Sequence, residues 1–386
     1  MSGSSKRGLI GLGAALATAG VVTAAGVAVD RVRRTRGGAL EPSDTYLQRP
    51  DVELVVIADD GVPLHVEVDE PAPGDATNGP GVPTPTVVFT HGYCLTSECW
   101  VLQRRALRRA GYRVVVWDQR GHGRSGRGSR ESCTIDQLGE DLFRVIEAVA
   151  PDGALALVGH SMGGMATIAL GEHHADLVTG RVVAFGCVST SAGGMPLARM
   201  GFATAAAKLL IERLGPGVFA QLAKRPELVR SVIRANTDLE EFLVERYSFA
   251  SPVPRSIVRL TARMIMGTDL QVMADFAPTF DAYDKTAVLR HFVGVDTLVF
   301  NGTEDLLTPP EHSEAIVRLI PGAEHVIIRD AGHVIMLEHP DLLTEQLEAL
   351  FARSVGARGH DSEVTRKPHV RRVVTPVAKP TGRHAS

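Results

Sequence analysis

The chain has 386 residues and a formal net charge of −3, and 44% of its residues are hydrophobic and 22% charged. This composition supports a sizeable core and excludes a chain that is disordered throughout. It also argues against a nucleic-acid partner bound through overall basic charge. The four cysteines form no CxxC pair and no Cys/His cluster at zinc spacing, so we expect neither a metal site nor a disulfide framework.

Residues 8–29 form the first distinct segment, a stretch of 22 residues without a charge. As a helix rising about 1.5 Å per residue, it would just span the roughly 30 Å hydrocarbon core of a bilayer. Basic residues flank it on both sides, so the positive-inside rule gives no orientation. We expect segment 1–37 to hold an uncleaved membrane anchor of the cell envelope. The alternatives are a signal peptide cleaved after Gly26-Val27-Ala28, which leaves a secreted protein, and a soluble helical arm.

Between residues 52 and 188, β-rich runs alternate with helical patterns, which is typical of a mostly parallel sheet covered by helices. The run opens with a hairpin, 52–57 and 63–68, around the turn signal Asp59-Asp60-Gly61. Further strands are expected at 86–90, 113–117, 154–158 and 181–188, and helices at 100–110, 135–150 and 162–173.

The alternation breaks between about 191 and 290, where the patterns at 203–214, 239–247 and 258–266 predict an inserted helical cap. Strands at 297–301 and 325–329 and helices at 310–319 and 340–353 complete a domain that spans 38–353. The last segment, 354–386, has no hydrophobic periodicity and many basic residues, which predicts a disordered basic tail.

A Gly-x-Ser-x-Gly motif, Gly159-His160-Ser161-Met162-Gly163, lies between a predicted strand and a predicted helix. At such a turn the serine hydroxyl is lifted off the end of the sheet, and the glycines let neighbouring backbone approach closely. The helix N-terminus directs unpaired N–H groups at the same place and favours developing negative charge. The motif predicts that Ser161 is a nucleophile; the alternative is an ordinary helix N-cap.

A serine nucleophile needs a base to take its proton and an acid to orient that base. Asp305 follows one predicted strand and His333 follows the next. Because the carboxyl ends of parallel strands meet at one edge of a sheet, this order lets Ser161, Asp305 and His333 converge. Glu304 and Asp296 are the alternatives to Asp305, and His339 is the alternative to His333.

Five motifs together resemble the α/β-hydrolase superfamily over roughly residues 52–353. They are Thr90-His91-Gly92-Tyr93, the run from Asp118 to Ser125, the serine motif, Gly302-Thr303-Glu304-Asp305 and Gly332-His333. The resemblance implies an α/β-hydrolase fold with an inserted helical cap. It also implies that the backbone N–H groups of Tyr93 and Met162 form an oxyanion hole. Losing one such donor typically costs about 3 kcal/mol of transition-state stabilisation.

These residues predict a cofactor-free serine hydrolase that cleaves carboxylic esters through an acyl-enzyme. The apolar cap, the N-terminal segment and a resemblance to monoacylglycerol lipases favour a lipid or acylglycerol ester as substrate.

Several alternatives remain open. Prolyl aminopeptidases, which the Asp118-Gln119-Arg120-Gly121 run resembles, and cofactor-free perhydrolases share the same triad. A ligand-binding protein on a hydrolase scaffold is the non-enzymatic alternative. We expect His91 to organise its loop, and Cys94 and Cys99 to be buried apolar groups or pocket lining.

Overall fold

The computed structural model describes residues 46, 48–71, 84–194, 237–357 and 370–376. The expected anchor at 8–29, with the alternative cleavage signal, and the expected helix at 203–214 lie outside these residues. Within the described ranges, no helix has both the length and the apolar character needed to cross a bilayer.

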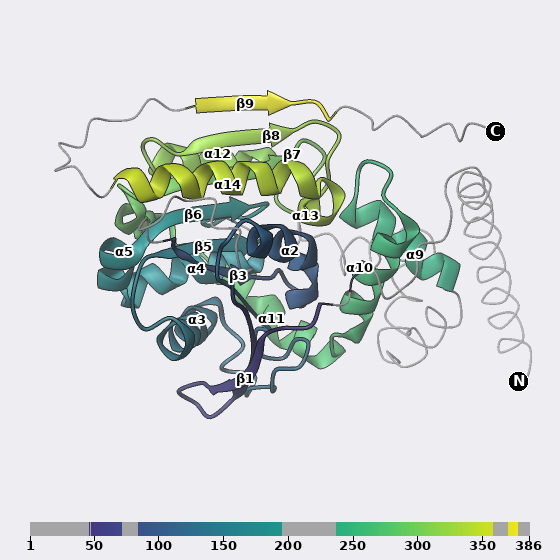
Figure 1. Ribbon diagram of the computed structural model, residues 1–386. Coiled ribbons are helices and arrows are strands. Elements are labelled where there is room, and N and C mark those ends of the chain that lie inside the picture. The colour runs from purple at the N-terminus through teal and green to yellow at the C-terminus, as the bar shows by residue number, and fades with distance from the viewer. Residues whose placement is uncertain (1–45, 47, 72–83, 195–236, 358–369, 377–386) are drawn as a thin grey trace, which may run out of the picture.

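A nine-stranded sheet forms the centre of the described part of the chain (Figure 1). Its strands are β1 (Val52–Ile57), β2 (Pro63–Asp69), β3 (Thr86–Thr90), β4 (Val114–Trp117), β5 (Leu155–His160), β6 (Val182–Val188), β7 (Asp296–Gly302), β8 (Glu324–Ile328) and β9 (Val370–Val374). Their spatial order is β1-β2-β4-β3-β5-β6-β7-β8-β9. Only the β1–β2 and β2–β4 pairs are antiparallel, so the predicted mostly parallel sheet and its opening hairpin are confirmed.

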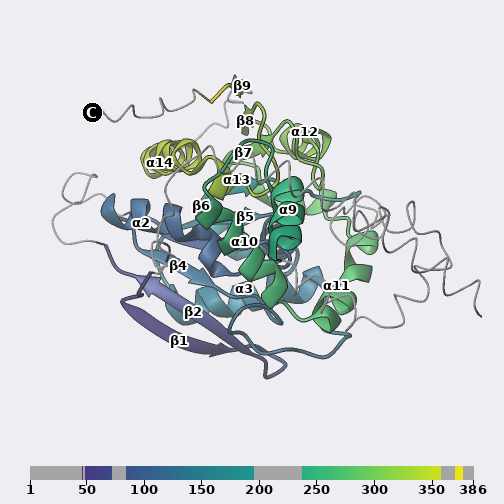
Figure 2. The ribbon, with the colours of Figure 1, turned by 90° about the vertical axis from the view of Figure 1, so that its right-hand side faces the viewer.

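Helices cover both faces of the sheet because alternate strand residues point to opposite sides. In β3, Val87 and Phe89 pack with α2 (Val101–Arg109) and α14 (Pro340–Ala357). Val88 packs on the other face with α3 (Ile135–Val149) and α4 (Met162–His173). Figure 2 shows α2 and α14 on one side of the central strands and α12 (Pro310–Leu319) on the other. Burial on both faces explains why the central strands are almost continuously apolar.

The described part of the expected cap contains three helices, α9 (Thr237–Ser248), α10 (Arg255–Gly267) and α11 (Leu270–Ala282). The first two coincide with helical patterns in the sequence. The pattern analysis missed α11 because Pro278 lies inside it and removes one backbone donor. Its N-terminus is capped by Asp269, which accepts a hydrogen bond from the Gln271 amide at 2.7 Å. Shorter elements are α5 (Ala175–Arg181), α13 (Ile335–Glu338), η2 (Ser97–Trp100) and η4 (Thr286–Phe292).

The expectation of a disordered tail from residue 354 onward is wrong in two places. Helix α14 continues to Ala357, and β9 pairs in parallel with β8 at the edge of the sheet. The β9 strand is also held by Arg371, which binds Glu314 at 3.3 Å, and by Arg372, which binds Gln346 at 3.1 Å. The main-chain partner of β9 lies more than forty residues earlier in the chain, so no local pattern indicated this strand.

Candidate active site

Ser161 occupies a sharp turn between β5 and α4. Its φ of 51° and ψ of −118° are strained for a residue with a side chain, and such strain is typical of functional turns. The neighbouring glycines make the turn possible. A Cβ atom on Gly163 would lie 2.3 Å from the Thr90 carbonyl oxygen, and one on Gly164 would lie 2.5 Å from Thr190 Oγ1. The sequence therefore folds here into the turn that the motif predicts.

Gly163→Ala is expected to disturb this turn, because the new Cβ meets backbone atoms that have no freedom to rotate away. We expect α4 to shift relative to the loop after β3, with kcat falling by about tenfold to a hundredfold and stability by about 1–3 kcal/mol. Ester hydrolysis and thermal unfolding measure the two effects. Gly180→Ala is the matched control, since its Cβ meets nothing within 4 Å, and we expect it to be neutral or slightly stabilising.

Asp305 and His333 form a buried pair at the carboxyl ends of β7 and β8. The Nδ1 of His333 lies 3.0 Å from Oδ1 and 2.9 Å from Oδ2 of Asp305. Asp305 also accepts hydrogen bonds from the backbone amides of Leu307 and Thr308, each at 2.9 Å, and from Thr308 Oγ1 at 2.8 Å. Because its Nδ1 donates to a carboxylate, His333 carries its free lone pair on Nε2.

The Asp305 carboxyl group is held ionised by these contacts. Burial alone raises its pKa, but the charge of His333 and the hydrogen bonds from His333 and Thr308 outweigh burial, and the net pKa lies below the ordinary value. The alternatives do not share this position. Glu304 is bonded by Thr303 Oγ1 at 3.2 Å, Asp296 begins β7 at its opposite end, and His339 Nε2 lies 3.4 Å from Ser251 Oγ.

Contacts across the turn bring the other expected site residues to Ser161. His160 Nε2 donates to the backbone oxygen of His333 at 2.9 Å, and the two rings lie 4.7 Å apart. A Cβ on Gly92, the residue before Tyr93, would lie 3.2 Å from the Cβ of Ser161. Met162 is the first residue of α4. The structure thus places the segments of all five expected site residues around one end of the sheet.

The loops around this end are fastened by buried hydrogen bonds. His91 accepts from the Gln119 amide at Nε2, at 2.9 Å, and its Nδ1 therefore donates to the Gly92 carbonyl at 2.8 Å. His91 organises its loop, as expected. The Asp118–Ser125 run is likewise structural, since Asp118 accepts from the amides of Ser97 and Arg124. Arg120 does not border the site, because it is buried against Asp141 and Asp60.

The cysteines near the site are buried apolar groups. Burial is the main cause that raises the pKa of the Cys94 and Cys99 thiols. Both therefore stay protonated at neutral pH, which disfavours a thiolate nucleophile.

Sequence reasoning missed two contacts of this site. Thr308 donates hydrogen bonds to Asp305 from its hydroxyl and its backbone amide. The Asp-x-x-Thr spacing, at which an aspartate often accepts bonds from residues two or three positions later, could have indicated this contact. The Tyr93 hydroxyl donates to the Met273 carbonyl of α11 at 2.6 Å, which ties the expected oxyanion loop to the cap. No local sequence pattern connects residues that lie 180 positions apart.

Two buried neutral histidines lie beside the site. Burial is the largest cause that lowers the pKa of each to about 3, and the electrostatic influence of a neighbouring histidine, His91 for His122 and His333 for His160, comes second. The unfolded chain binds protons at these residues below about pH 6.5, while the folded chain does not until about pH 3. The contribution of these two histidines to the free energy of unfolding is therefore fully present above pH 6.5 and is lost as the pH falls toward 3.

His122→Phe removes one of these two titrating groups and is therefore expected to flatten this loss. Phenylalanine suits the position because His122 packs near the rings of Tyr93 and Phe276, 6.1 Å and 5.7 Å away. Between pH 6 and 4, the free energy of unfolding of the wild type should fall more steeply than that of the variant, by about 1.4 kcal/mol per pH unit. Denaturant unfolding curves at several pH values measure this difference. The reference is pH 8, at which His122 is neutral in both the folded and the unfolded chain. Parallel pH curves for the two proteins would contradict the prediction.

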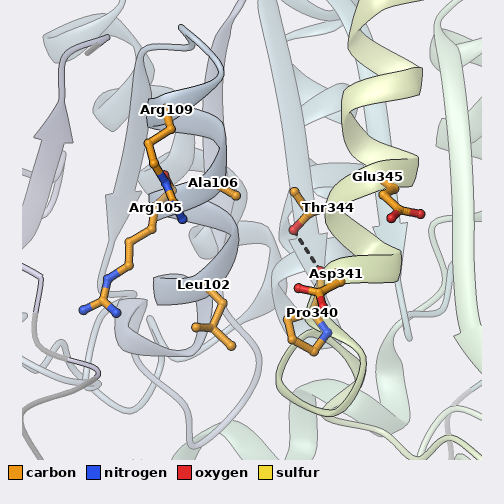
Figure 3. Close-up of a pocket in the computed structure, with 8 residues that line it drawn as sticks. All are labelled: Leu102, Arg105, Ala106, Arg109, Pro340, Asp341, Thr344 and Glu345. Carbon is orange, nitrogen blue, oxygen red and sulfur yellow. Dashed lines mark hydrogen bonds between the residues drawn. The ribbon is translucent and has the colours of Figure 1, made fainter. Parts of the chain in front are cut away.

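A groove lies between α2 and α14 (Figure 3). Arg105 and Arg109 line it from α2, and Asp341 and Glu345 line it from α14. None of the five expected site residues lines it, so the groove is not the candidate active site.

Comparison with known proteins agrees with this fold. The family model "Alpha/beta hydrolase family" matches residues 87–346. The chain is 27% identical over 264 residues to "Putative carbamate hydrolase RutD" of Caulobacter sp. (strain K31), covering 68% of this chain and 89% of that protein. It is 26% identical over 237 residues to "Non-heme chloroperoxidase" of Burkholderia pyrrocinia, covering 58% and 75%. The esterase EaEST from Exiguobacterium antarcticum superposes with a TM-score of 0.59 at 20% identity, covering 78% of this chain and 100% of that one.

Proposed function

Since the chain belongs to the alpha/beta hydrolase family, we propose that it is a serine hydrolase that cleaves carboxylic esters through an acyl-enzyme. One observation carries the proposal: Ser161 lies in a strained strand-to-helix turn, and the residue before it, His160, bonds the backbone of His333, which is paired with the buried Asp305. A histidine whose Nδ1 is bound by a carboxylate is prepared to accept a proton at Nε2.

The proposed reaction has two halves. In the first, His333 Nε2 takes the proton of Ser161 while the serine oxygen attacks the ester carbonyl, and the protonated His333 then gives that proton to the leaving alcohol. In the second, His333 takes a proton from water, whose oxygen attacks the acyl-enzyme. The protonated His333 then returns that proton to the Ser161 oxygen as its bond to the acyl group breaks and the acid leaves. The backbone N–H groups of Tyr93 and Met162 stabilise the oxyanion in both halves. Asp305 keeps the imidazole oriented and stabilises its positive charge.

We propose a lipid or acylglycerol ester as the substrate. Helix α11 of the cap covers the beginning of α4 with an apolar cluster that includes Met162, Met165, Phe276 and Phe280. Such a roof suits an acyl chain better than a charged substrate, and the methionine side chains can adapt to its shape.

Hydrolysis of p-nitrophenyl esters from acetate to palmitate by the full chain tests this proposal. We expect turnover that depends on Ser161 and peaks at medium or long chains. A peak at acetate would contradict the lipid substrate and favour a small-substrate esterase or a perhydrolase. A folded protein without turnover on any ester would contradict the hydrolase itself.

We also propose that residues 8–29 anchor the protein in the membrane of the cell envelope. The first described contact after them is close: the Tyr46 hydroxyl lies 3.1 Å from Ser256 Oγ on α10. The connecting residues 30–45 number sixteen and span at most about 56 Å when extended. The catalytic domain would thus stay near a lipid surface.

Alkaline carbonate extraction of isolated membranes tests the anchor. We expect the full chain to remain in the membrane pellet and to keep its first residues, as read by mass spectrometry. Release into the supernatant, or a mature chain that begins after Ala28, would contradict it and favour the secreted alternative.

A further inference from the structure

The carboxylate of Glu338 lies buried one short helix after His333, with 8% of the residue exposed. Its Oε2 accepts a hydrogen bond from the Gly332 amide at 2.6 Å. Its Oε1 accepts from the Ala250 amide at 2.9 Å, from the Ser251 amide, and from Ser251 Oγ at 2.7 Å. One side chain thus joins the loop of His333 to residues 250–251, which follow α9 in the cap.

A neighbouring cap residue, Ser248, holds the backbone of His333 from its other side. The Val334 amide donates to the carbonyl of Ser248, the last residue of α9, at 2.9 Å. A Cβ on Gly332 would lie 2.8 Å from that carbonyl oxygen, so the two segments are in close contact. His160 bonds the carbonyl of His333 itself. The backbone is thus fixed at His333 and at both of its neighbours, and the bonds at Gly332 and Val334 both lead to the cap.

We propose that Glu338 is a positioning residue that sets the backbone of His333 and couples it to the end of α9, an inference that rests on the hydrolase function proposed above. Glu338 touches neither the substrate nor the reacting atoms. It fixes the loop that carries His333, the proposed base, and a shift of about 1 Å in such a loop can cost a factor on the order of 100 in rate. A cap that moves at α9 therefore moves His333 as well.

The hydrogen-bond pattern predicts that even a glutamine fails at this position. All four partners of Glu338 are donors, and a carboxylate offers acceptors on both oxygens. A glutamine has one acceptor oxygen and one NH2 group. Whichever way its amide turns, the NH2 group faces a donor, either at Gly332 or at residues 250 and 251.

Steady-state kinetics of Glu338→Gln in the full chain test the proposal. We expect kcat to fall by about tenfold to a hundredfold, with KM within about threefold because the pocket is untouched. The matched control is Glu345→Gln, the same chemical change on an exposed carboxylate of α14 (Figure 3), and it should keep the wild-type kcat. Ser251→Ala, which removes one donor and leaves the other three, should lower kcat by about twofold to fivefold.

A second measurement does not depend on turnover. The Nδ1 proton of His333, bound to Asp305, should give a downfield proton NMR signal that is absent in His333→Gln. We expect this signal to shift or broaden in Glu338→Gln and to be unchanged in Glu345→Gln. If the wild type shows no Ser161-dependent turnover, the proposed hydrolase fails, and the NMR comparison alone decides the role of Glu338.

A purely structural role predicts a different result. Glu338→Gln would then lower the thermal midpoint while the folded protein kept the wild-type kcat and the wild-type signal, which would overturn the proposal. If this variant does not fold, Ser251→Ala decides: an unchanged kcat and an unchanged signal would overturn the proposal too.

Discussion

Ser161→Ala is expected to lower kcat for ester hydrolysis by a factor on the order of 10⁴ or more. Without the hydroxyl the proposed acyl-enzyme cannot form, and only binding and the proposed oxyanion donors remain to assist water. The fold should persist, because the Ser161 side chain makes no cap bond to the helix that it precedes. Initial rates on the best p-nitrophenyl ester, with circular dichroism on the same sample, measure both expectations.

Ser191→Ala is the sharpest control for this variant. Ser191 Oγ lies 2.9 Å from His312 Nδ1, so Ser191 is another serine whose hydroxyl contacts a histidine. Its hydroxyl also bonds the Gly193 carbonyl at 2.7 Å, which indicates a turn-stabilising role. We expect less than about a tenfold loss of kcat, as for a residue outside the reaction. A larger loss in Ser191→Ala than in Ser161→Ala would show that the nucleophile is wrongly assigned.

Asp305→Asn should be the second most damaging change, with kcat lowered by about 10³-fold to 10⁴-fold. If the new NH2 group faces His333, it needs an acceptor at Nδ1. The imidazole proton then moves to Nε2, which can no longer accept the proton of Ser161. Because the size of the side chain is unchanged, the loss should lie in kcat rather than in KM. Steady-state kinetics at neutral pH measure it.

Asp330→Asn is the matched control for Asp305→Asn. Asp330 is exposed and has a φ of 54°, a conformation that asparagine tolerates. It should keep kcat within about twofold. Equal losses in the two variants would contradict the role of Asp305.

The low pKa of Asp305 adds a check on stability. The ionised Asp305 contributes to the free energy of unfolding above its unfolded pKa of 3.8, and this contribution is lost as the pH falls through the lower folded pKa. The difference in stability between Asp305→Asn and the wild type should therefore narrow in acid.

The framework around the site was predictable from local patterns. The runs at 86–90 and 162–173 coincide with β3 and α4 because the strand is apolar on both faces and the helix starts at a glycine-rich turn. Parallel strands present their carboxyl ends together, so the chain order Ser161, Asp305, His333 was sufficient to place the three residues at one edge of the sheet. The pairing of His333 with Asp305 rather than with Glu304 agrees with this reasoning.

The contacts that join distant segments were not predictable. Glu338 meets residues 250 and 251, and Tyr93 meets Met273, across separations that no periodicity reports. Helix α11 was hidden by Pro278, and β9 depends on main-chain pairing with β8 rather than on its own pattern. Tertiary contacts decided these features, and all of them except β9 connect the cap to the site.

Covalent labelling with a fluorophosphonate tests the central claim most directly, because such a probe reacts with an activated serine and leaves a stable adduct. Peptide mass spectrometry then identifies the modified residue. We expect one adduct, on Ser161, which disappears in Ser161→Ala and forms much more slowly in His333→Gln. No adduct on the folded protein, or an adduct on Ser191 instead, would contradict the assignment of Ser161 as a nucleophile activated by His333 and Asp305.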